Sequence, residues 1–187
     1  MRRIPFATSF GLCLLSLLGS PAQAADWSLS YIGQQIVASG TSFQGTTVGG
    51  LSGIDFDAST GTYYAISDDR SGLNPARFYN LSLNLNQFVR SATPGAAGVN
   101  FNSVTTLQTP LGTAFAPNTV DPEGIRYNAA TQTLVWSNEG QRAAGGLQTP
   151  TVREMRLDGT HVREFSVPTA YQPAGSVAGT TAGDRGI

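Results

Sequence analysis

The chain has 187 residues, of which only 12% are charged, while glycine (22) and proline (10) are frequent. All basic residues are arginine, and they nearly balance the acidic ones, giving a formal net charge of −1. Nucleic-acid binding rests on clustered Lys and Arg that neutralise phosphates, so this balance argues against a nucleic-acid partner. The frequent glycine and proline favour short strands joined by turns over helices.

Residues 1–24 have the pattern of a cleavable export signal. Arg2 and Arg3 give a positive start, residues 10–18 form an apolar run, and residues 22–24 form a small-residue cleavage site. The run is far shorter than the roughly 20 residues that a membrane helix needs. The single cysteine, Cys13, lies in this run and would leave with it. We therefore expect a mature chain of residues 25–187 without disulfides, soluble and free of the membrane after cleavage, in the periplasm or outside the cell.

Two segments of the mature chain resemble each other. Gly53 and Gly124 stand at equivalent positions, and each is followed by isoleucine, an aromatic residue, Asp or Asn, alanine and threonine. With a one-residue gap, residues 64–69 then match residues 134–139, and residues 77–81 fall opposite residues 153–157. Such a repeat indicates one supersecondary unit used twice.

Each copy of the repeat predicts short strands joined by turns. Asp57–Gly61 and Asp158–Gly159 are hairpin signals between apolar or aromatic residues. Four short strands make one propeller blade, which cannot bury its faces alone. We predict an all-β fold, a partial β-propeller of about two blades of four antiparallel strands plus an N-terminal strand, as an incomplete domain. A self-contained β-sandwich with two related halves is the alternative. Residues 91–120 and 169–184 are expected to be long loops.

Acidic residues gather where the predicted strands begin or end. Asp68 and Asp69 follow one strand, Asp121 and Glu123 precede another, and Glu139 follows that one. In neighbouring blades, equivalent strand ends lie on the same side, so these carboxylates would converge on one opening, as the oxygen ligands of Ca²⁺ must. The alternative is that they form Asx turns and caps in ordinary loops.

Arginines stand beside these carboxylates, at positions 70, 77 and 142. A guanidinium binds phosphate or carboxylate through paired N–H donors. It pairs equally well with a neighbouring Asp or Glu, so both interpretations stay open for each arginine.

Several familiar chemistries find little support. His161 is the only histidine and no Gly-x-Ser-x-Gly motif occurs, which argues against a Ser-His-Asp hydrolase. We interpret Ser52 as part of a turn that enters a strand. Zinc sites built from His and Cys are excluded by composition. The aromatic residues of the repeats are expected to pack between blades: Phe56, Tyr63, Tyr64, Tyr127 and Trp136.

Several motifs, in order, resemble the family named for the esterase-like activity of phytase, a phytase-like β-propeller group of exported bacterial proteins. The resemblance covers most of residues 45–172. It is carried by Gly49–Asp57, Ile66–Ser71, Ala76–Tyr79, Asp121–Ile125, Ser137–Gly140 and Phe165–Pro168. The family pattern continues further, whereas only residues 183–187 remain of that region here, so we expect activity from the full-length product.

The resemblance implies a hydrolase that acts on phosphate or carboxylic esters of small molecules, assisted by calcium. In this hypothesis the cation is held by Asp68, Asp69, Glu123 and Glu139, while Arg70 and Arg77 bind the anionic substrate. No catalytic residue is assigned. The alternative is a non-catalytic propeller that binds a periplasmic or extracellular partner through the same opening.

Overall fold

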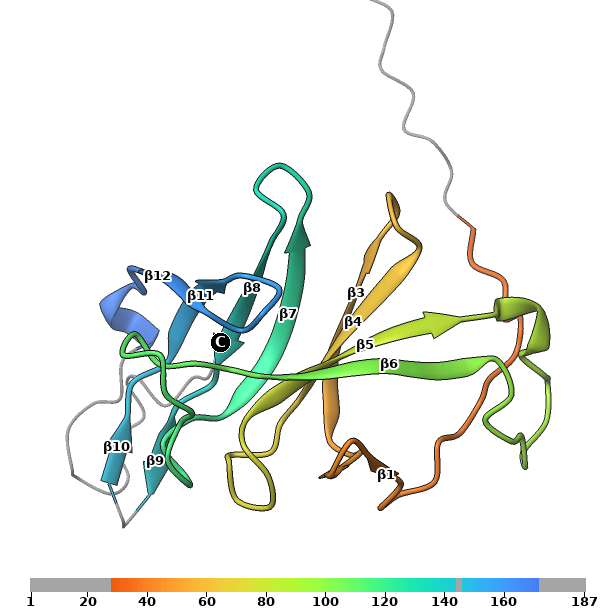
Figure 1. Cartoon of the computed structure of the whole chain (residues 1–187), viewed down its shortest axis with the longest axis horizontal. Helices are drawn as coiled ribbons and strands as arrows, with labels where there is room; N and C mark the ends of the chain where they lie inside the picture. The colour runs from red at the N-terminus through yellow and green to blue at the C-terminus, as the bar shows by residue number, and fades with distance from the viewer. Residues whose placement is uncertain (1–27, 144–145, 172–187) are drawn as a thin grey trace, which may run out of the picture. The chain divides into compact units, whose positions relative to one another are not determined.

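The computed structural model describes residues 28–143 and 146–171 (Figure 1). The predicted export signal and most of the predicted loop 169–184 lie outside these residues. Of the unit Met1–Tyr31 only residues 28–31 are described, without regular secondary structure, and the second unit is Ile32–Ile187. In the described ranges we find strands and two short 3-10 helices, Leu85–Gln87 and Thr169–Tyr171, but no α-helix. None of the helices there is long and apolar enough to span a membrane.

The first blade is a four-stranded antiparallel sheet in the order β3-β4-β5-β6. Its strands are β3 (Leu51–Asp57), β4 (Thr62–Ser67), β5 (Arg77–Leu83) and β6 (Val99–Thr106). The predicted turn after β3 is held by Asp57, whose carboxylate accepts hydrogen bonds from Ser59 and Thr60. Strand β6 lies inside the segment 91–120, so the prediction of a continuous loop there is wrong.

The second blade repeats this arrangement in the order β7-β8-β11-β12. Its strands are β7 (Pro122–Asn128), β8 (Thr133–Asn138), β11 (Thr151–Met155) and β12 (His161–Phe165). A small hairpin of β9 (Gln141–Ala143) and β10 (Gly146–Gln148) is inserted between β8 and β11. Two sheets of the same topology confirm the predicted all-β fold, which matches two blades of a partial β-propeller.

The register of the repeat differs from the one predicted. Asp57 pairs with Thr62 in the first blade and Asn128 with Thr133 in the second, so the offset of 71 residues continues through the hairpin without a gap. Asp68 is therefore the equivalent of Glu139, and the predicted match of Asp69 with Glu139 is wrong. The third strands also differ from the prediction. In the first blade Ala65 pairs with Tyr79, and in the second blade Trp136, the equivalent of Ala65, pairs with Arg153. Arg153 is therefore the equivalent of Tyr79 and not of Arg77.

The first strands of the two blades, β3 and β7, lie side by side (Figure 1). The backbone N–H of Tyr127 donates to Oδ2 of Asp55 at 2.6 Å, and the hydroxyl of Ser52 donates to the carbonyl of Glu123 at 2.9 Å. Ser52 therefore lies within β3, and the prediction that it forms a turn before the strand is wrong. Between the strands, a Cβ added at Gly53 would lie 2.7 Å from the Glu123 carbonyl oxygen. Glycine at position 53 is what lets the two blades approach this closely.

A Gly53→Ala variant is expected to lower the free energy of unfolding by about 1–3 kcal/mol, because the added methyl group must push the backbones of β3 and β7 apart. Urea unfolding followed by tryptophan fluorescence measures the change. Gly95→Ala is the matched control, since nothing lies within 4 Å of a Cβ there, and its effect should stay within about 0.5 kcal/mol. Equal midpoints for both variants would contradict the close approach.

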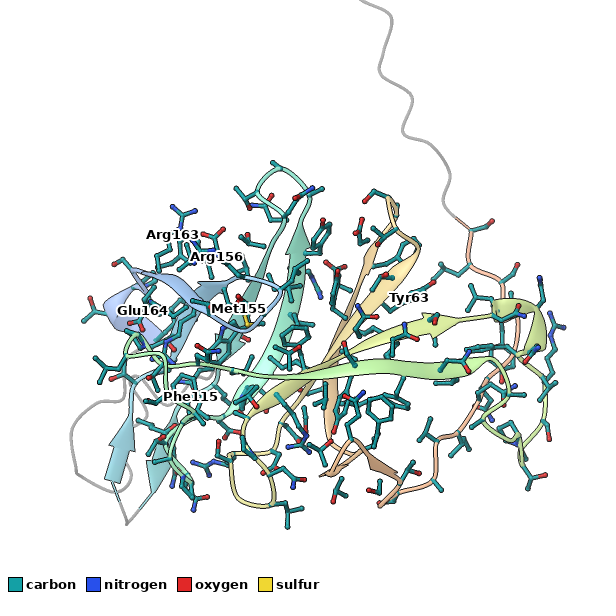
Figure 2. All side chains as sticks on the ribbon, in the orientation of Figure 1. Tyr63, Phe115, Met155, Arg156, Arg163 and Glu164 are labelled. Atoms are coloured by element: carbon teal, nitrogen blue, oxygen red, sulfur yellow. The ribbon has the colours of Figure 1, made fainter. Side chains whose placement is uncertain are left out.

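The main core fills the space between the two sheets. Tyr64, Ile66 and Phe78 from the first blade meet Trp136 and other side chains of the second. The core also includes Phe115, which precedes β7, and Met155 (Figure 2). Packing between the blades is thus confirmed for the predicted aromatic residues Tyr64, Tyr127 and Trp136. Phe56 is 44% exposed and contacts the tilted ring of Tyr63 outside this core.

The other face of the first blade is covered by the segment before it. There the hairpin of β1 (Ser42–Phe43) and β2 (Thr46–Thr47) takes the place of the predicted single N-terminal strand. Val48 of this segment packs with Ala65, Tyr79 and Leu81 in a second cluster of buried side chains. This segment and the loop after β4 together form one end of the first blade.

Candidate functional site

Equivalent strand ends of the two blades carry the predicted carboxylates. The backbone N–H of Asp68, just after β4, donates to the carbonyl of Gly50 at 2.7 Å. The backbone N–H of Glu139, just after β8, donates to the carbonyl of Asp121 at 2.9 Å. Because the two bonds are equivalent in the repeat, Asp68 and Glu139 occupy the same place on neighbouring blades. Asp68 and Glu139 thus lie at matching strand ends, and a shared ligand-binding opening there stays a prediction.

Four carboxylates, which we call the carboxylate cluster, lie close enough to repel one another: Asp68, Asp121, Glu123 and Glu139. Burial raises the pKa of Glu123 above its ordinary value, and the negative charges of the other three raise it further. Burial likewise raises the pKa of Asp121, with Glu139 and Asp68 adding to the shift and Arg70 opposing it. Asp121 was not among the predicted metal ligands, although it stands at the entrance to β7 beside Glu123.

Arg70 lies beside the carboxylate cluster. Its Nε is 3.4 Å from Oδ2 of Asp121, and its Nη2 donates to the side-chain oxygen of Gln141. The buried Nε atom has no hydrogen-bond acceptor among the described residues. The Arg70 side chain is 31% exposed, and its role in binding substrate stays a prediction.

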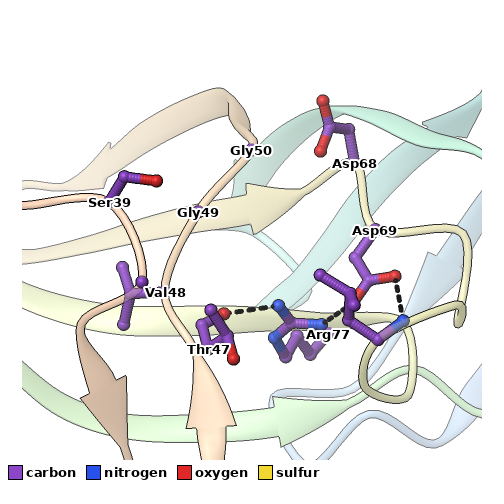
Figure 3. A pocket seen from close by; sticks show the side chains of 10 residues that line it. Ser39, Thr47, Val48, Gly49, Gly50, Asp68, Asp69 and Arg77 are labelled. Carbon is purple, nitrogen blue, oxygen red and sulfur yellow. Dashed lines mark hydrogen bonds and ion pairs between the residues drawn. The ribbon is translucent and has the colours of Figure 1, made fainter.

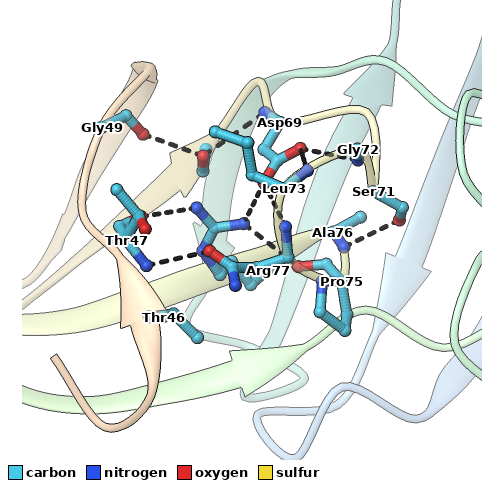
Figure 4. Close-up of polar contacts among 12 residues, drawn as sticks. Thr46, Thr47, Gly49, Asp69, Ser71, Gly72, Leu73, Pro75, Ala76 and Arg77 are labelled. Carbon is cyan, nitrogen blue, oxygen red and sulfur yellow. Dashed lines mark hydrogen bonds and ion pairs between the residues drawn. The ribbon is translucent and has the colours of Figure 1, made fainter. Parts of the chain in front are cut away.

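Arg77, the other predicted substrate-binding arginine, has a different environment (Figure 4). Its side chain is only 2% exposed and its guanidinium donates to Asp69 at 2.7 Å. Its other acceptors are the Tyr79 hydroxyl at 2.7 Å and the carbonyls of Thr47 at 2.7 Å and Pro75 at 3.3 Å. These contacts join β2 to β5, so the geometry favours a structural role for Arg77.

Asp69 is the partner of Arg77 in this network, and its carboxylate is also used by the chain around it. Oδ1 accepts from the backbone N–H groups of Gly72 and Leu73, and Oδ2 accepts from Asn74 as well as from Arg77. Burial alone would raise the pKa of Asp69, but these hydrogen bonds, that of Arg77 first, hold it below its ordinary value. The role of Asp69 as a metal ligand stays a prediction, and its geometry is that of a loop anchor.

The carboxylate cluster has the donor chemistry of a calcium site, because carboxylate oxygens are the ligands that Ca²⁺ prefers. Within the described ranges, however, no three His, Cys, Asp or Glu side chains are grouped closely enough to hold a metal ion. The cluster suits a cation in two respects: its ligands are carboxylates, and a positive charge would relieve the repulsion among Asp68, Glu123 and Glu139. The structure does not show a closed set of ligands.

A cavity of about 330 Å³ opens next to the carboxylate cluster, between the N-terminal segment and the loop after β4 (Figure 3). One wall is formed by residues 39–40 and 47–50, and the other by Asp68, Asp69, Leu73 and Arg77. Asp68 belongs both to this cavity and to the carboxylate cluster. The cavity could not be predicted from the sequence, because its walls come from segments that only the fold brings together.

The fold and site together define an all-β protein of propeller-like blades with a carboxylate-rich edge. The family model of phytase-like proteins, described as esterase-like activity of phytase, matches residues 46–187. The chain therefore belongs to this phytase-like family, as its sequence motifs predicted. Neither the curated proteins nor the solved structures gave a match.

Proposed function

We propose that this protein is an exported hydrolase of phosphate or carboxylic esters that acts at the carboxylate cluster. The observation that carries the proposal is the convergence of four carboxylates from equivalent ends of two blades, beside Arg70, in a chain of the phytase-like family. Export is supported by the signal-like pattern of residues 1–24. The substrate is a small-molecule ester.

In this proposal Asp68, Glu123 and Glu139 would supply carboxylate ligands to a calcium ion and would draw closer together on binding it, with Asp121 beside them. A bound cation supplies Lewis acidity toward an ester oxygen and lowers the pKa of bound water. Arg70 contributes paired N–H donors to an anionic group of the substrate. Arg77 and Asp69 hold the adjoining loop in place and take no part in binding.

The negative charge of the cluster predicts how strongly the hydrolysis of different esters depends on calcium. Four carboxylates face one arginine, so a phosphate ester that carries two negative charges is repelled at close range unless a cation neutralises the site. A neutral carboxylic ester meets no such repulsion. Calcium should therefore matter more for phosphate esters than for carboxylic esters.

The direct test is hydrolysis of phytate, p-nitrophenyl phosphate and p-nitrophenyl acetate by the full-length gene product, with calcium and with a chelator. We expect turnover of phosphate esters to fall at least about tenfold when calcium is removed, and turnover of the acetate to change less. The single variant Arg70→Gln should raise KM for phosphate esters more than for the acetate. Absence of turnover of all three substrates in both conditions would contradict the hydrolase and favour a binding protein.

A further inference from the structure

The cavity beside the carboxylate cluster has an asymmetric distribution of charge. Arg77 and Asp69, both on its wall, form an ion pair at 2.7 Å, and both oxygens of Asp69 already accept hydrogen bonds. Their charges therefore cancel at short range. Asp68 has an exposed side chain, and no described residue donates a hydrogen bond to its carboxylate. The cavity thus carries one negative charge that the described residues leave unmatched.

The backbone keeps this carboxylate at the cavity. The N–H of Asp68 is bonded to the carbonyl of Gly50, and a Cβ at position 50 would collide with Oδ1 of Asp68. Gly50 also has a φ of 56°, a left-handed conformation that glycine adopts without strain. A side chain at position 50 would therefore displace the Asp68 carboxylate from its place against this wall.

Apolar surface lies close to the charged group. Leu73, in the loop after β4, is 80% exposed and lines the cavity together with Val48. A cavity of about 330 Å³ has room for an organic molecule of several non-hydrogen atoms, which a bare ion would not fill. The surroundings thus suit a ligand with a cationic head and a short alkyl chain.

We propose that this cavity binds a small organic ammonium group, whose N–H donors meet the carboxylate of Asp68 while its alkyl part contacts Leu73. A charge-assisted hydrogen bond is the strongest contact that an unmatched carboxylate can make. An anion would face Asp68 and the rest of the carboxylate cluster, so it is disfavoured. This inference does not depend on the proposed hydrolase activity.

The test is a titration of the protein with n-butylammonium and, separately, with n-butanol, followed by two-dimensional ¹H–¹⁵N NMR in the presence of a chelator. The two probes share their alkyl chain and differ in charge. We expect n-butylammonium to bind about tenfold more tightly than n-butanol. Its shifts should centre on the backbone amides of Gly49, Gly50 and Asp68.

Two variants separate a built site from general attraction to an acidic surface. Asp68→Asn should lose the preference for the ammonium probe. Glu139→Gln removes one negative charge from the equivalent position of the second blade, outside the cavity. This variant should largely keep the preference for the ammonium probe. Equal binding of both probes, or equal losses in the two variants, would overturn the proposal. Because the readout is binding without turnover, its failure would leave the hydrolase proposal standing.

Discussion

Replacing Arg77 by methionine is expected to lower the free energy of unfolding by about 3–5 kcal/mol. The guanidinium is 2% exposed and its four hydrogen bonds hold Asp69, Tyr79 and two backbone carbonyls. Methionine fills much of the volume but leaves the carboxylate of Asp69 with its charge partner removed. Asp69 is 10% exposed and keeps its three backbone N–H donors, but removing one partner of a largely buried ion pair is among the largest single destabilising effects known in proteins.

Chemical unfolding at neutral pH measures this effect, with Arg90→Met as the control. Arg90 is exposed and makes no hydrogen bond with the described residues, so its replacement should change stability by less than about 0.5 kcal/mol. Arg77→Lys should recover only part of the loss, because an ammonium cannot reach all the acceptors of the planar guanidinium. If Arg77→Met unfolds like the wild type while ester binding is lost, then Arg77 binds substrate as first predicted from the sequence.

The repeat and its all-β architecture could be predicted because their signals are local. Asp57 accepts hydrogen bonds from Ser59 and Thr60, and Gly61 has a φ of 72°, so these residues mark a tight turn. These residues are needed for the backbone conformation wherever they occur in the chain. The sequence therefore carries the strand–turn–strand pattern twice without reference to distant segments.

The register and the fourth strand of the first blade could not be predicted in the same way. Strand β6 is rich in Asn, Ser and Thr, and it is a strand because its backbone pairs with β5. The gap placed in the hairpin came from matching residue types, whereas the paired backbones show equal hairpin lengths. Pairing between distant segments overrides local composition in both places.

The sequence predicted where the candidate site residues lie better than it predicted what their side chains do. The strand-end positions predicted for Asp68 and Glu139 are found, with matching backbone hydrogen bonds, and the ligand roles of Asp68, Glu123 and Glu139 stay predictions. The sequence could not show that the loop after Asp69 turns back and directs three backbone N–H groups at its carboxylate. It also could not show that Asp121 is brought beside Arg70 by the packing of β7 against β3 and β4 of the first blade.

Glu123→Gln is expected to stabilise the protein at neutral pH while reducing its hydrolytic activity. Burial and the neighbouring carboxylates raise the pKa of Glu123 in the folded state, so ionising it costs more in the folded protein than in the unfolded chain. Wild-type stability is therefore lost as the pH rises from the ordinary carboxyl range through the raised pKa. Glutamine cannot ionise, so in a chelator the variant should be more stable at about pH 7 and equal to the wild type below about pH 4.

Calcium should reverse this order of stability, so that the wild type becomes more stable than the Glu123→Gln variant. If Glu123 holds the cation, then calcium stabilises the wild type more than Glu123→Gln, because a ligand stabilises the folded state according to its affinity. Phosphate ester hydrolysis at low calcium should fall at least about tenfold in the variant and recover as calcium is raised. Glu164→Gln, in the exposed ion pair with Arg153, provides the control for removing one charge. A residue that lowers stability without its ligand and is needed for turnover is placed for function. A stabilised variant with unchanged activity and unchanged response to calcium would show instead that Glu123 serves neither cation nor substrate.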